Sequence, residues 1–311
     1  MRINMGSMKK NDTAEGIVIL VVILIALAGS LFGKSGTDST NNGGVKREPV
    51  LGGNNIVSQE APSEIEVSLS TGNAPRAYQS FEEYITLNNR GSDPINITGW
   101  YLKNGKDKRA YNVGGELRYF APDIAYIGKA TPFLSPSGNN LMLDVILERG
   151  ERAIITTGAL ATQAPYKIVS FKENICSGYL ENMDEYKFTP PLTRNCPRPA
   201  DETGLERLDV ECRKFIERLP SCQTPEFETR DADGSICRNC VNGKPLSNAC
   251  VAFIRDRFGY AGCIANHVND EDFYGKTWRI FLGRGWEMWA KEYETMELFD
   301  RFGRLISSRS Y

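Results

Sequence analysis

Two segments that lie almost two hundred residues apart alternate apolar and polar positions. In the first, residues 83–102, Ile85 and Leu87 have polar neighbours, and the same spacing returns after a polar turn. The second, residues 294–305, is the tail of the chain and shows a similar alternation. A period of two predicts strands with one buried face. We therefore expect the two segments to be parts of one β-domain.

The phase of the alternation changes within the first segment. Ile95 and Ile97 share one parity, whereas Trp100 has the other. A slip of this kind at Gly99 is typical of a β-bulge or of a bend between two sheets. Further short runs of β-formers follow, and no segment between residues 64 and 168 has a helical period. This pattern predicts an all-β sandwich or barrel.

The runs EYITLNN, INITGWYLKN and VILERGERAIITTG together resemble the lamin-tail domain, although Arg149 stands where that family usually has a proline. The resemblance implies an immunoglobulin-like β-sandwich of the kind found in membrane-anchored bacterial proteins. It also implies structural or binding work, no catalytic set, and a core position for Trp100. The matching positions are Glu83, Ile85, Leu87 and Leu147, together with the core signature Tyr84, Gly99, Trp100, Leu102, Gly150, Glu151, Asp300 and Gly303.

One difference from the family concerns the last strands. The run Trp278–Leu282 begins over a hundred residues after the strand expected at residues 153–157. We therefore expect a sandwich built from residues 64–171 plus 272–311, interrupted by a mostly helical, cysteine-rich insertion at residues 172–271. Two consecutive domains are the alternative. The final hairpin would then be an isolated pair of strands, which is marginal in water.

An uncharged apolar run, residues 16–33, lies near the start of the chain. As a helix with a rise of ~1.5 Å per residue it would reach roughly 27 Å, enough to cross a hydrocarbon core. The three basic residues ahead of it favour an N-terminus inside the cell. We therefore expect a cytoplasmic N-terminus at residues 1–13, a single-pass transmembrane signal anchor at residues 14–33, and an extracytoplasmic remainder.

The alternative is a signal peptide cleaved near Ala26-Leu27-Ala28, which would make the protein secreted. Residues 34–63 are rich in Gly, Asn, Ser and Thr and predict a flexible linker. The formal net charge is −2 and the basic residues are dispersed, so we do not expect a nucleic-acid partner. The partners we expect are the membrane, through residues 14–33, and an envelope or extracellular protein or glycan.

All eight cysteines lie in the predicted insertion. An even number on the exported side of a membrane predicts a disulfide framework. Many pairings are open, and the simplest joins sequence neighbours, as Cys176–Cys196, Cys212–Cys222 and Cys250–Cys263. Two helices are predicted in the same segment, one at Leu205–Leu219 and one capped by Ser247. The cysteines are Cys176, Cys196, Cys212, Cys222, Cys237, Cys240, Cys250 and Cys263.

Two other hypotheses apply to some of these cysteines. Cys237-Arg-Asn-Cys240 has the spacing of a redox pair, but no thioredoxin-like strand and helix surround it. As zinc ligands, Cys237, Cys240, Cys250 and Cys263, with His267 as a spare, contain only one of the two C-x2-C pairs usual for such a site. We favour structural disulfides.

Three further motifs carry possible chemistry. Asp231–Ser235 hints at a calcium loop, although a solvated turn is the interpretation we favour. His267 lies near Asp270, which could orient it as a base, but no nucleophile motif is close in sequence. Trp286 and Trp289 precede the final hairpin and could form an exposed binding surface. Packing between the insertion and the sandwich is the simpler expectation for both indoles.

Together these patterns predict a membrane-anchored, extracytoplasmic binding or structural module, and not an enzyme. They predict no cofactor and no metal. The alternative is an exported enzyme, either a carboxylate-dependent hydrolase or a thiol oxidoreductase that uses Cys237 and Cys240.

Overall fold

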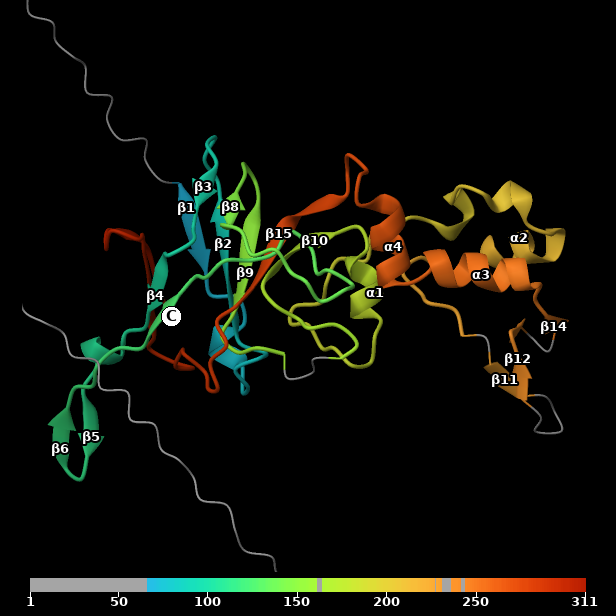
Figure 1. Ribbon diagram of the computed structural model, residues 1–311. Helices are drawn as coiled ribbons and strands as arrows, with labels where there is room; N and C mark the ends of the chain where they lie inside the picture. The colour runs from blue at the N-terminus through green and yellow to red at the C-terminus, as the bar shows by residue number, and fades with distance from the viewer. Residues whose placement is uncertain (1–65, 161–163, 227, 231–235, 242–243) are drawn as a thin grey trace, which may run out of the picture. The chain divides into compact units, whose positions relative to one another are not determined.

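The computed structural model describes residues 66–160, 164–226, 228–230, 236–241 and 244–311 (Figure 1). These residues belong to one compact unit, Glu60–Tyr311. The unit is mainly β, with several sheets and few helices, so the predicted fold class is confirmed at this level.

The first sheet has five strands in the order β1-β2-β9-β15-β10. All neighbours are antiparallel except β9 and β15, which run parallel. Parallel strands cannot be joined by a tight turn, and the chain between β9 and β15 contains β10 and the whole cysteine-rich segment. The strands are Val67–Ser70 (β1), Tyr84–Asn89 (β2), Arg152–Thr156 (β9), Phe171–Asn174 (β10) and Tyr274–Phe281 (β15).

The second sheet has four antiparallel strands in the order β17-β16-β4-β7. The tail strand β16 pairs with β4, and Leu298 lies opposite Leu102. The predicted association of the tail with the early segment is therefore confirmed. The strands are Tyr101–Lys103 (β4), Ile124–Tyr126 (β7), Thr295–Phe299 (β16) and Leu305–Ser310 (β17).

One hydrophobic core holds side chains from both sheets. Ile85 and Ile155 come from the five-stranded sheet, and Leu102 and Leu298 come from the four-stranded sheet. All four are almost completely buried. Trp100 lies in the same core and is only 3% exposed, which confirms its expected core position. Two sheets around a shared core fit a β-sandwich.

The predicted irregularity at Gly99 is also present. Gly99 has a φ of +83°, in the left-handed region that favours glycine. It lies between β3, which pairs with β8, and β4 of the four-stranded sheet. The chain therefore leaves one sheet and enters another at this residue. The smaller elements are η1 (Ala74–Arg76), β3 (Ile95–Asn96), η2 (Lys106–Lys108), β5 (Tyr111–Val113), β6 (Glu116–Arg118) and β8 (Ile146–Leu147).

The cysteine-rich segment contains the α-helices (Figure 1). The predicted cap is confirmed, because the Ser247 hydroxyl accepts a hydrogen bond from the Cys250 amide. The prediction of one helix at Leu205–Leu219 is wrong. The Asp209 backbone is extended and its carboxylate caps a new helix. The elements are α1 (Ser177–Glu181), η3 (Pro199–Asp201), η4 (Leu205–Arg207), α2 (Val210–Ile216), α3 (Asn248–Arg257) and α4 (Tyr260–His267), with two small ladders, β11 (Glu228–Arg230) with β12 (Ile236–Arg238) and β13 (Cys240–Val241) with β14 (Lys244–Pro245).

All eight cysteines form disulfides, but the sequence-neighbour pairing is wrong. The pairs are Cys176–Cys263, Cys196–Cys222, Cys212–Cys250 and Cys237–Cys240. Helix packing explains the difference, since Cys212 on α2 and Cys250 on α3 share one small core. Disulfides of this number indicate an oxidising, extracytoplasmic environment.

The cysteine-rich segment is joined to the sheets by packing and by a buried ion pair. A second core combines Leu134 and Phe171 with Tyr179 of α1 and Cys263 of α4. Strand β10 crosses the predicted boundary at residue 172 and pairs with β15. The boundaries of sandwich and insertion stay a prediction.

The buried ion pair consists of Glu173 on β10 and Arg279 on β15, whose Nε donates to the carboxylate over 2.5 Å. The two other guanidinium nitrogens of Arg279 donate to the carbonyls of Pro190 and Pro191, each over 2.7 Å. Thr193 donates to the second oxygen of Glu173. One ion pair thus fixes a loop of the cysteine-rich segment to the five-stranded sheet.

The predicted N-terminal segment, anchor and linker, residues 1–63, lie outside the described residues. Among the helices that the structure does describe, none has the length and apolar character needed to cross a membrane.

Candidate binding cleft

A cleft of about 630 Å³ lies between the β2–β3 loop and the β16–β17 turn. Its volume is in the range of sites that hold small ligands. Residues 91–96 line one side, and residues 300–302 with Arg304 line the other. Glu66 and the core residue Trp100 complete the lining.

Asn89, at the end of β2, holds the first wall. Its side chain is almost completely buried and donates to the carbonyls of Asp93, over 2.8 Å, and Leu147, over 2.9 Å. Its side-chain oxygen accepts from the Gly91 amide at 3.0 Å. Asparagine commonly bonds the backbone two residues ahead in this way and so fixes a turn. The loop that forms this wall is therefore anchored to the sandwich.

Asp300 holds the second wall in the same manner. Its carboxylate accepts from the amides of Phe302 and Arg304, each over 2.9 Å, and from the Arg304 guanidinium over 2.6 Å. Burial alone would raise the pKa of Asp300, but the hydrogen bonds from Arg304 and Phe302 outweigh it and lower the pKa. Gly303 completes the turn with a φ of +81°. This wall is thus also fixed before any ligand binds.

Phe302 is the most exposed of the large apolar side chains that line the cleft. It is 76% exposed, although it is a large aromatic residue. The guanidinium groups of Arg301 and Arg304 lie 5.6 and 5.9 Å from the centre of its ring. These distances are within the range of cation–π contacts. The wall therefore presents an aromatic ring flanked by two cations.

The core-signature residues divide into three groups. Trp100 and Leu102 are buried in the shared core, as the resemblance implies. Glu151 is also buried, and it pairs with Lys172 over 2.6 Å. Tyr84, by contrast, is only half-buried. The remaining members are the turn or bend residues Gly99, Gly150, Asp300 and Gly303.

Trp286 and Trp289 do not form a common exposed surface, so a binding site made of both indoles is not supported. Trp286 is 62% exposed, whereas Trp289 is 5% exposed and lies in the shared core. The loop is held by the buried Glu83, whose carboxylate accepts from the amides of Met288 and Trp289. Burial raises the pKa of Glu83, and these hydrogen bonds oppose the rise. Trp289 has a packing role.

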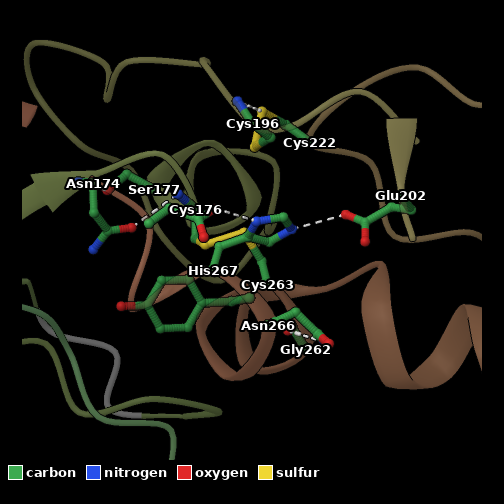
Figure 2. Close-up of a disulfide and its surroundings, with 12 residues drawn as sticks. Asn174, Cys176, Ser177, Cys196, Glu202, Cys222, Gly262, Cys263, Asn266 and His267 are labelled. Carbon is green, nitrogen blue, oxygen red and sulfur yellow. Dashed lines mark hydrogen bonds and ion pairs between the residues drawn. A yellow bond between two sulfur atoms is a disulfide. The ribbon is translucent and has the colours of Figure 1, made fainter. Parts of the chain in front are cut away.

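His267 lies at the end of α4, beside the Cys176–Cys263 disulfide (Figure 2). Its Nε2 is 2.9 Å from Glu202 and its Nδ1 is 2.7 Å from Asp270. Burial lowers the pKa of His267, but the hydrogen bonds that the ring makes to the carboxylates of Asp270 and Glu202 more than reverse this and raise the pKa. Both ring nitrogens are therefore engaged, and the ring lacks the free nitrogen that a general base needs.

The zinc hypothesis finds no site among the described residues. Cys237 and Cys240 form a disulfide with each other, so neither supplies a thiolate for zinc. Within the described ranges, no group of three or more His, Cys, Asp or Glu side chains could hold a metal ion. The calcium-loop motif at residues 231–235 lies outside the described residues.

Comparisons with protein-family models, with curated proteins and with solved structures each give no match for this chain. The lamin-tail resemblance therefore rests on the residues quoted for it, and it stays a prediction.

Sequence reasoning found Asp300 and Gly303 but missed the two residues between them. Arg301 and Phe302 had a detectable signal, since an aromatic residue inside a turn is unusual in a sandwich that buries its apolar side chains. Asn89 was assigned only to a polar turn. Its role depends on Leu147, which is distant in sequence, so no local pattern could have identified it.

Proposed function

We propose that this protein is an extracytoplasmic binding module, held at a membrane by residues 14–33, which takes its ligand in the cleft beside Trp100. A lamin-tail-like, immunoglobulin-like sandwich supports this proposal, because such folds carry binding loops at their ends. The four disulfides support a location outside the cytoplasm.

The observation that carries the proposal is the anchoring of both cleft walls. Asn89 fixes one and Asp300 fixes the other, and both side chains are buried. A wall that is already fixed loses little conformational freedom when a ligand binds, so more of the contact energy contributes to affinity. Phe302 remains exposed within this fixed frame, where its ring is available to a ligand.

The engagement of both nitrogens of His267 supports binding in preference to acid–base catalysis. Among the described residues, this histidine is the candidate base that the sequence offered. With Glu202 and Asp270 it forms an ion-paired cluster that ties α4 to the segment around η3. We assign this cluster to stability.

A retention assay tests the proposed function. Immobilised Glu60–Tyr311 is incubated with a solubilised envelope fraction from the organism that encodes the protein, and the retained material is quantified. Phe302→Ala and Ser92→Trp change the two cleft walls at exposed side chains, so neither should unfold the protein. Trp286→Ala removes another exposed aromatic side chain, one outside the cleft, and serves as the matched control.

We expect Phe302→Ala and Ser92→Trp to lower retention at least about fivefold, while Trp286→Ala retains as much as the wild type. Thermal melts of each variant confirm that the fold is intact. Loss of retention in Trp286→Ala alone, or equal retention by all variants, would contradict the assignment of the cleft.

A further inference from the structure

The two walls of the cleft carry opposite charges. Glu66 and Asp93 lie on the wall formed by the β2–β3 loop, and Arg301 lies on the other wall. A side-chain carbon added at Gly91 would lie 3.5 Å from the Cβ of Glu66, which shows that Glu66 belongs to the loop's wall. The cleft is therefore bipolar.

These charges form no ion pairs among the described residues. Among the described residues, neither Glu66 nor Asp93 has a cationic partner within ion-pair distance, and Arg301 has no carboxylate partner. Arg304 differs, because Asp300 already neutralises it over 2.6 Å. Two carboxylates and one guanidinium are thus available to a ligand. Exposed charges that have no ion-pair partner are suited to recognition.

We infer that the cleft binds a peptide segment that carries a cationic side chain and an anionic side chain, an inference that rests on the proposed function. The cation would face Glu66 and Asp93, and the anion would face Arg301. Phe302 would cover an apolar part of the chain between them. A peptide combines all three groups over a short length.

Other ligand classes fit the same walls less well. The phosphates of a nucleic acid would meet Glu66 and Asp93, and like charges brought together raise the free energy of the complex. A neutral glycan would leave the opposed charges without partners as it displaced their water. A lipid chain would use Phe302 alone. The bipolar peptide is the class that engages both walls.

The test uses blocked peptides in which a Lys and a Glu are separated by short alanine spacers of different length. Each has two matched controls, one with Gln for Lys and one with Gln for Glu. Binding to Glu60–Tyr311 is measured by fluorescence polarisation at low and high salt. The protein variants are Arg301→Gln and the double change Glu66→Gln with Asp93→Asn.

For the best spacer, we expect the Lys/Glu peptide to bind about fivefold more tightly than either control, which corresponds to about 1 kcal/mol for one exposed ion pair. Arg301→Gln should remove the preference for Glu only, and the double variant should remove the preference for Lys only. High salt should weaken both preferences.

Two results would overturn the inference. One is equal binding of the three peptide types at every spacer length. The other is binding that responds to charge but not to these three residues. If the peptides fail while envelope material is still retained in a Phe302-dependent manner, the ligand class is wrong and the cleft stands. If Phe302→Ala also retains as much envelope material as the wild type, the proposed function itself is wrong.

Discussion

Replacing Arg279 by methionine should destabilise the whole unit, because it leaves a buried charge without its partner. Glu173 and Arg279 are 2% and 3% exposed. Removal of one member of such a pair costs about 3–5 kcal/mol, since the remaining charge is uncompensated. The change also removes the donors to the carbonyls of Pro190 and Pro191. Thr193 still donates to Glu173 and keeps the cost within this range.

The expected loss is large on a thermal scale. For a domain of this size, each kcal/mol lowers the melting temperature by about 2–4 °C, so Arg279→Met should melt roughly 6–20 °C below the wild type. Circular dichroism melts under oxidising conditions measure the shift. Arg301→Met is the matched control, because the same change at an exposed arginine should cost less than about 0.5 kcal/mol.

A double variant separates the buried charge from the shape of the side chains. Glu173→Leu combined with Arg279→Met removes both charges and should recover most of the stability, because apolar replacements of buried ion pairs are often neutral. The carbonyls of Pro190 and Pro191 and the hydroxyl of Thr193 would remain without partners, which keeps the recovery incomplete. A single variant that melts within about 2 °C of the wild type would refute this reasoning. So would a double variant less stable than the single one.

Three further predictions concern other parts of the unit. The two carboxylate partners of His267 raise its pKa by more than burial lowers it, so the folded-state pKa lies above the ordinary value. The stabilising contribution of the protonated ring is therefore complete below about pH 6.5 and is lost as the pH rises through the folded-state pKa. Melts from about pH 5 to 9 should show this loss in the wild type and not in His267→Gln. Deleting residues 294–311 removes β16 and the buried Leu298, so the cooperative melt should disappear, and a truncated protein that still melts cooperatively would contradict the shared core. Replacing both cysteines of Cys176–Cys263, which are 87 residues apart, should lower the free energy of unfolding by ~4–5 kcal/mol, against ~2 kcal/mol for Cys237–Cys240, which are 3 apart. Equal losses of stability in urea unfolding would show that loop length does not determine the difference.

The sheets were predictable because their signal is local. The alternation at Ile85 and Leu87 predicts β2. The change of parity at Gly99 predicts the bend at which the chain leaves one sheet and enters another. The tail strand β16 was recognised from its own pattern and from the Asp300–Gly303 turn. Burial on one face leaves a period of two in the sequence, whatever the partner strand is.

The helices and the disulfides were less predictable because they depend on contacts across the fold. Leu205–Leu219 has a helical period, yet Asp209 adopts an extended backbone and starts a new helix. The pairing of Cys212 with Cys250 follows from the packing of α2 on α3, which spacing does not contain. One wall of the cleft was missed for the same reason, since the role of Asn89 depends on its hydrogen bond to Leu147, which is distant in sequence.

The assignment of the ligand site to the cleft is tested most directly by NMR. Glu60–Tyr311 labelled with nitrogen-15 is titrated with the best-binding peptide or with the retained envelope material, and amide and indole shifts are followed. We predict that the largest changes occur at Gly91, at Phe302 and at the Trp100 indole. Changes confined to Trp286 or to the cysteine-rich segment, with the cleft signals unmoved, would contradict it.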